Sequence, residues 1–323
     1  KTNRLEAPMI TKTIPFSAEE YERRLTKART AMEAAGIEVL CVTDPSNMAW
    51  LTGYDGWSFY VHQGVVVFLD AEPFWWGRSQ DRNGALRTVW MEDSRCYGYA
   101  DHYVQSTERH PMEELAAQLN AMGVGTSRIG VEMENYYYTA RAHAVLTHEL
   151  PEARITDGTG IVNWCRTVKS AEELDFMRKA ARISEKIVDG WLERVEPGVP
   201  KNHVVAEIMR DAVRGVDDAW GDYAAIVPLL PSGTDAAAPH LTWDGRPFAE
   251  GEATFFEIAG CYRRYHVPFC RTVFLGEPPE LFKHAEAALV GGLEAGLEMA
   301  RAGNRACDVA IALADELMAW SER

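Results

Sequence analysis

The stretch Phe256–Thr272, FEIAGCYRRYHVPFCRT, is a β-rich, largely apolar segment that also carries side chains able to do chemistry. Those considered for a role are its one carboxylate, Glu257, its one histidine, His266, and two of its three arginines, Arg264 and Arg271. A carboxylate on an otherwise apolar strand either forms a structural ion pair, here with one of the two arginines, or belongs to a functional site. The residues alone leave both interpretations open.

Composition narrows the class of protein. The chain has 323 residues, of which 47% are hydrophobic and 25% are charged, and this balance is typical of a globular protein with room for two domains. Its net charge of −15 argues against nucleic acid or an anionic membrane as a partner, because both attract basic surfaces. No signal-peptide pattern and no run of 18 apolar residues occurs, which predicts a cytoplasmic location.

The six cysteines are widely scattered and form no CxxC pair. In a chain of this size such spacing indicates reduced thiols and not a disulfide framework. We expect Cys41 and Cys165 to be buried, because both lie in apolar stretches.

The first half of the chain alternates helical and strand patterns. Ser17-Ala18-Glu19-Glu20 is a capping box and predicts a helix that ends at Gly36. Ile37–Thr43 is a short apolar run that predicts a buried strand, closed by a turn at Asp44-Pro45. Further strands are expected at 65–69 and 129–133, and helices at 112–122 and 139–150. This order predicts an α/β domain over residues 14–160.

The second half begins with another capping box, Ser170-Ala171-Glu172-Glu173, which opens a long amphipathic helix. The order of the elements after it predicts an α+β domain over residues 161–323. We expect helices at 204–213, 281–302 and 308–318, and strands at 224–230 and within 254–274. The last helix is followed by no closing strand, which predicts that the C-terminal part of this domain is missing from the chain.

Three segments resemble signatures of the creatinase/prolidase family, the M24 or pita-bread hydrolases. Asp44–Asn47 (DPSN) with Trp50–Tyr54 (WLTGY) is similar to the N-terminal P-x-N-x-x-Y-L-T-G signature. Arg166–Ser170 (RTVKS) resembles the start of the family's linker helix, and Ser232-Gly233 followed by Pro239-His240 resembles the element that supplies a pocket histidine. The resemblance implies a creatinase-like N-terminal domain, a pita-bread catalytic domain and a homodimer.

The stretch around Glu257 departs from that family. Aligned on Arg271-Thr272, the first of the two metal-binding aspartates of the family falls on Glu257, and the second falls on Pro268, whose side chain has no donor atom. A two-metal centre is therefore not expected, and the resemblance predicts no cofactor and no metal ligand.

A narrower resemblance is to the ectoine hydrolase branch of the family. It rests on Gly53–Gln63 (GYDGWSFYVHQ), Trp75–Arg78 (WWGR), Asp101–His110 (DHYVQSTERH) and Phe256–His266. It implies hydrolysis of a small zwitterionic cyclic amidine, ectoine, with 5-hydroxyectoine as a further substrate, to an N-acetyl-diaminobutyrate.

For this chemistry Glu257 is the candidate nucleophile or general base, with a covalent intermediate in the first case. His240 is the candidate proton shuttle and His266 the second candidate, because imidazole titrates near neutral pH. Each could instead be an ordinary structural histidine.

The candidate substrate-binding residues are acidic, basic and aromatic, since a zwitterion needs an anion, a cation and a wall for its cationic ring. The aromatic residues could also be packing or dimer contacts, and the charged ones could lie on a solvated face. The candidates are Tyr54, Asp55, Trp57, Tyr60, Arg78, Asp222, Arg264 and Arg271.

Three other functions stay open from the sequence. One is a metal-dependent Xaa-Pro peptidase, which Pro268 disfavours. Another is a creatinase-like amidinohydrolase, and the last is a module that binds a ligand or partner without catalysis.

Overall fold

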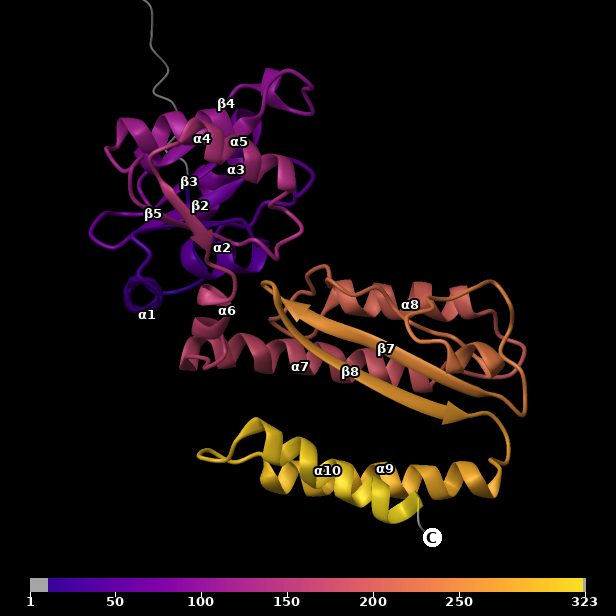
Figure 1. Ribbon diagram of the computed structural model, residues 1–323. Helices are drawn as coiled ribbons and strands as arrows, with labels where there is room; N and C mark the ends of the chain where they lie inside the picture. The colour runs from indigo at the N-terminus through magenta and orange to yellow at the C-terminus, as the bar shows by residue number, and fades with distance from the viewer. Residues whose placement is uncertain (1–10, 322–323) are drawn as a thin grey trace, which may run out of the picture. The chain divides into compact units, whose positions relative to one another are not determined.

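A computed structural model describes residues 11–321 (Figure 1). The chain forms two compact units that divide between Asp175 and Phe176, inside helix α7 (Ala171–Leu192). The predicted division at residues 160 and 161 stays a prediction, and each unit is described by itself below.

The N-terminal unit is built on a six-stranded mixed sheet with the strand order β4-β3-β2-β1-β5-β6. Strand β1 is central, antiparallel to β2 and parallel to β5. The strands are β1 (Val39–Val42), β2 (Gly64–Phe68), β3 (Phe74–Arg78), β4 (Cys96–Tyr99), β5 (Arg128–Val131) and β6 (Arg154–Asp157).

Helices cover both faces of this sheet. Because side chains alternate along a strand, Leu40 and Val42 pack into one core and Val39 and Cys41 into another. The first core is completed by α1 (Ala18–Ala35), α2 (Pro45–Thr52), α3 (Ser79–Thr88) and α6 (Ile161–Arg166), and the second by α4 (Pro111–Ala121) and α5 (Ala140–Glu149). The predicted α/β class of this half is confirmed, as is the burial of Cys41 and Cys165.

The turn predicted at Asp44-Pro45 is wrong. Asp44 is the N-cap of α2, where its carboxylate accepts the N–H of Asn47, and Pro45 occupies the first helical turn. Proline is favoured there because its missing N–H would have no partner inside the helix. The dipeptide therefore starts a helix directly after β1.

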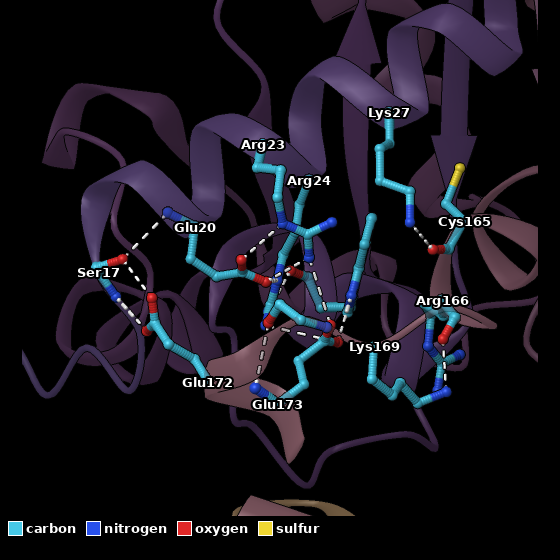
Figure 2. Close-up of polar contacts among 12 residues, drawn as sticks. Ser17, Glu20, Arg23, Arg24, Lys27, Cys165, Arg166, Lys169, Glu172 and Glu173 are labelled. Carbon is cyan, nitrogen blue, oxygen red and sulfur yellow. Dashed lines mark hydrogen bonds and ion pairs between the residues drawn. The ribbon is translucent and has the colours of Figure 1, made fainter. Parts of the chain in front are cut away.

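The two predicted capping boxes take part in one polar cluster (Figure 2). Ser170 and Glu173 cap each other reciprocally, as predicted. Ser17 accepts the N–H of Glu20 as predicted, but its own N–H donates to Glu172. In the first capping box, Glu172 at the start of α7 thus accepts the Ser17 N–H that Glu20 was expected to accept.

Buried charges in the same cluster are paired. Arg24 is fully buried, and its guanidinium bonds to Glu20 at 2.6 Å, lies 3.6 Å from Glu173 and donates to the carbonyl of Trp50 (Figure 2). The indole of Trp50 donates to Glu173 at 2.8 Å. Arginine hydrogen bonds hold the pKa of Glu20 at about 2 against the opposing effect of burial. The cluster fixes the first turn of α7 to α1.

The C-terminal unit contains the rest of α7, helix α8 (Lys201–Arg214) and a long hairpin of β7 (Ala253–Tyr262) and β8 (Tyr265–Phe274). The two-residue turn is Arg263-Arg264, and both residues have positive φ, which matches the twist of a tight hairpin. Helices α9 (Glu280–Met299) and α10 (Ala306–Ser321) follow and pack on each other (Figure 1). Helices and an antiparallel pair give the predicted α+β character, whereas the predicted loss of a C-terminal part stays a prediction.

The strand predicted at 224–230 is wrong. This segment is irregular, with a bend at Ala225-Ile226, and it pairs only through a single bridge between Leu229 and Glu257. Pro228 precedes the bridge and has no N–H, so a continuous ladder cannot form there.

One face of the hairpin packs on α7. Phe256 stacks on the indole of Trp191, with ring centroids 4.6 Å apart. Gly260 approaches the helix so closely that its N–H donates to the Ser184 hydroxyl, and that hydroxyl donates to the carbonyl of Val267 at 2.6 Å. Because Phe256 and Gly260 face α7, the alternate residues Glu257 and Ala259 face the other way.

Among residues 11–321, none of the helices combines the length and apolarity that crossing a bilayer requires.

Candidate functional site

Glu257 lies on the hairpin face that is turned away from α7. Its strand neighbours Phe256 and Ile258 are buried, whereas Glu257 is half-buried and lies opposite Cys270. Its backbone is fixed by two hydrogen bonds with Leu229. Within residues 11–321 its carboxylate forms no ion pair or hydrogen bond, so a reacting group could approach it without breaking one.

The two arginines proposed as structural partners of Glu257 have other contacts. Arg264 donates to Asp222 at 2.9 Å and lies 3.7 Å above the ring of Tyr223. Arg271 is exposed and donates to the carbonyl of Cys270. The structure therefore brings two of the predicted binding residues together, Asp222 and Arg264, as an ion pair stacked on an aromatic ring.

His266 is held by the backbone on both sides of its ring. Nε2 accepts the N–H of Ala225 at 2.9 Å, and Nδ1 lies 2.8 Å from the carbonyl of Arg264, to which it donates in the neutral tautomer. Burial lowers the pKa of His266, which favours this neutral form. Its position on β8 opposite Cys261 places it on the same face as Glu257.

His240 lies on an exposed loop and has a φ of +67°, which is unfavourable for a residue other than glycine. The loop is tethered to β7 at its start, where the hydroxyls of Ser232 and Thr254 are buried and lie 3.0 Å apart. After the loop, the carbonyl of Thr242 accepts the N–H of Leu230. These bonds anchor the loop beside the strand that carries Glu257.

The residues around Glu257 do not fit a two-metal centre. Pro268 offers no ligand, and both nitrogens of His266 are already hydrogen bonded. Throughout residues 11–321, no three histidine, cysteine, aspartate or glutamate side chains are grouped as metal ligands. We therefore derive no step of the reaction through a metal.

The remaining candidates belong to the N-terminal unit, where three of them have structural contacts. Tyr54 is 3% exposed and donates to Gln63, and burial raises its pKa. Arg78 pairs with Asp81 at 2.9 Å and donates to the hydroxyl of Tyr60. Tyr54 is thus a core residue, and Arg78 is committed to neighbours on its own unit.

Two aromatic candidates are exposed, Trp57 at 65% and Tyr60 at 60%. Exposed aromatic side chains of this size are typical of binding surfaces. Asp55 is also exposed, and its N–H donates to the hydroxyl of Thr88. The predicted aromatic cluster therefore separates into a buried member, Tyr54, and an exposed pair.

Sequence reasoning missed Tyr223 and the hydroxyl pair of Ser232 and Thr254. Tyr223 directly follows Asp222, so an aromatic residue next to a candidate acid was the available signal. The hydroxyl pair joins residues 22 positions apart, and no local pattern announces it.

Comparisons with known proteins agree with this architecture. Residues 24–168 match the creatinase/prolidase N-terminal domain, and residues 175–319 match metallopeptidase family M24. The chain is 54% identical to the ectoine hydrolase of Halomonas elongata over 94% of its own length and 78% of that protein.

Solved structures share the fold at low identity. The prolidase from Thermococcus sibiricus is 16% identical, with a TM-score of 0.80 over 94% of this chain and 79% of that one. The dipeptidase PepE from Mycobacterium ulcerans is 22% identical, with a TM-score of 0.77 over 95% and 78%. The chain therefore belongs to the M24 creatinase/prolidase family.

Proposed function

We propose that this protein hydrolyses ectoine by opening its cyclic amidine ring. The observation that carries the proposal is the 54% identity to an ectoine hydrolase over 94% of the chain. The likeness to prolidases is below 25% identity and supports the fold alone.

The overall reaction adds one water to the carbon between the two ring nitrogens. One carbon–nitrogen bond breaks, the departing nitrogen gains a proton, and the carbon becomes the carbonyl of an N-acetyl-diaminobutyrate. We propose that a Glu257 oxygen attacks this carbon first, that the ring nitrogen leaves, and that water then displaces the carboxylate from the same carbon. In the alternative role, the carboxylate deprotonates the attacking water.

The free carboxylate of Glu257 suits either role. The carboxylate is half-buried and forms no hydrogen bond or ion pair within residues 11–321. Its negative charge can therefore attract the positively charged amidinium of the substrate. The amidinium carbon is electrophilic without further polarisation, whereas a peptide carbonyl gains several kcal/mol from a Lewis acid. A metal-free reaction is therefore part of the proposal, and Pro268 at the second aspartate position supports it.

Proton transfer to the leaving nitrogen is assigned to His240 and not to His266. Both nitrogens of His266 are engaged by the Ala225 N–H and the Arg264 carbonyl, so the ring positions these two segments. His240 lies on an exposed loop and its ring forms no hydrogen bond within residues 11–321.

For the substrate carboxylate we propose the Arg264 guanidinium, oriented by Asp222 and by the ring of Tyr223. The expectation that Trp57 and Tyr60, exposed aromatic residues of the N-terminal unit, contact the cationic ring stays a prediction. The homodimer that the resemblance implies stays a prediction.

The test is a substrate panel with the purified protein, read out by product mass and by amine release. Ectoine and 5-hydroxyectoine should be opened, whereas creatine and Xaa-Pro dipeptides should be left intact. Chelator treatment should leave the rate unchanged. Turnover of a dipeptide that is lost with chelator and restored by divalent metal would replace the proposal with a metal-dependent peptidase, and binding without turnover of any substrate would favour a non-catalytic module.

A further inference from the structure

The N-terminal unit contains a cavity of about 180 Å³, and none of the residues described around Glu257 lines it. It lies where the start of β2 and the end of β4 meet the starts of α4 and α5. Its wall is partly apolar, through Val61, Val104 and Pro111, and partly aromatic. The other lining residues are Tyr60, His62, Tyr99, Tyr103, Gln105, Ser106, Arg109, His110, Thr139 and Arg141.

The charge of this lining is opposite to that of the whole chain. The chain carries a net charge of −15, yet the lining includes two arginines and no carboxylate. Glu113 and Glu114 on α4 are occupied, since one accepts the backbone N–H of His110 and the other accepts the hydroxyl of Tyr103. The residues that line the cavity therefore carry positive charge only, although the chain as a whole is acidic.

Arg141 holds the loop that forms the mouth of the cavity. Its guanidinium donates to the carbonyls of Ser106, Thr107 and Arg109. The side chain of Arg109 is exposed and forms no hydrogen bond or ion pair within residues 11–321. One cation thus shapes the mouth, and a second is available to a ligand.

His110 supplies a hydrogen-bond donor in the wall. Its side chain is 5% exposed, and Nδ1 accepts the N–H of Met112, so the neutral ring carries its proton on Nε2. Within residues 11–321 no acceptor binds that nitrogen. The ring lies 4.6 Å from that of His62, and burial lowers the pKa of both, that of His110 to about 4. Nε2 is not among the fully buried polar atoms that lack a partner within residues 11–321, so it has accessible surface, and an oxygen of a ligand could accept its proton.

We propose that this cavity binds a small free organic carboxylate. One carboxylate oxygen accepts the Nε2 proton of His110, and Arg109 neutralises the charge at the mouth. The apolar remainder of the ligand packs on Val61, Val104 and Pro111. The site does not use Glu257, so a test of carboxylate binding in the cavity is independent of a test of ring opening.

The test is a titration of histidine-labelled protein with sodium butyrate at pH 7.5, followed by NMR. The ring signals of His62 and His110 should shift and saturate with a Kd on the order of 1 mM, which is ordinary for a ligand of six heavy atoms. Arg109→Ala should weaken binding about fivefold, because it removes one charge contact. His110→Asn should weaken butyrate binding about tenfold, because the Nε2 donor is lost. The side-chain oxygen of the introduced asparagine can still cap α4.

Controls separate this site from general charge effects and from the catalytic site. Arg154→Ala removes an exposed cation of β6 elsewhere on the unit and should leave the Kd unchanged, as should Glu257→Gln. Butyramide, a neutral isostere, should bind at least tenfold more weakly. Absence of a saturable shift up to 50 mM butyrate (about 50-fold above the expected Kd), equal binding of inorganic phosphate, or an unchanged Kd in Arg109→Ala would overturn the proposal.

Discussion

Replacing Gly260 by alanine should separate the hairpin from α7. An added Cβ would lie 2.5 Å from both the Ala180 carbonyl oxygen and the Ser184 nitrogen, and 2.6 Å from the Ser184 hydroxyl. Two of these atoms are backbone, so the strand has to move, and such overpacking costs about 1–3 kcal/mol. The move also breaks the Gly260–Ser184–Val267 hydrogen bonds, worth about 1 kcal/mol each. The free energy of unfolding should therefore fall by about 3–5 kcal/mol.

Urea unfolding followed by circular dichroism measures this loss, and Gly291→Ala is the matched control. Gly291 lies in α9, and its added Cβ meets no atom within 4 Å, so alanine should stabilise the helix by about 0.5–1 kcal/mol. Opposite shifts of the two midpoints are expected. Gly260→Ala with the unfolding midpoint of the unmodified protein would refute the close packing of the hairpin on α7, and with it the direction in which Glu257 faces.

Two further predictions concern the N-terminal unit and the start of α7. Ser170→Ala should lower the free energy of unfolding by about 1 kcal/mol through loss of the cap to the Glu173 N–H, and Ser170→Thr should restore most of it; equal losses in both would contradict the capping role. Burial lowers the folded pKa values of His62 and His110, so the unfolded chain binds protons more readily, and stability present above about pH 6.5 should be lost as the pH falls toward 4. For His110 the loss of stability amounts to as much as about 3 kcal/mol. When urea midpoints are measured against pH, those of His110→Asn should therefore fall less steeply than those of the unmodified protein. Parallel curves for the two proteins would contradict this role of His110.

Local rules predicted the elements whose signals are local. The capping boxes at Ser17 and Ser170 marked helix starts correctly, because an N-cap depends on residues within one turn. The bond expected from the Ser17 N–H to Glu20 is replaced by a bond to Glu172. Glu172 lies 155 residues from Ser17, so no local sequence pattern contains both residues. Strand β4 was missed because its CYGY sequence is short and lacks apolar alternation.

The candidate site was predictable residue by residue but not as an arrangement. The Asp222–Arg264 pair joins positions 42 residues apart, and the Ala225–His266 bond joins positions 41 apart. The hairpin turn at Arg263-Arg264 has no glycine or asparagine, so its positive φ values carried no sequence signal. Which hairpin face Glu257 occupies depends on these long-range contacts.

The central claim is that the Glu257 carboxylate attacks the substrate without the help of bound metal. The most direct measurement compares the turnover of ectoine by the unmodified protein and by Glu257→Gln, both in chelator, with intact-mass analysis of quenched reactions. We predict a loss of at least about 1000-fold in kcat for the variant, and a substrate-derived mass increase on Glu257 in the unmodified protein alone. Near-normal turnover by Glu257→Gln, or turnover by the unmodified protein that stops in chelator, would contradict the account.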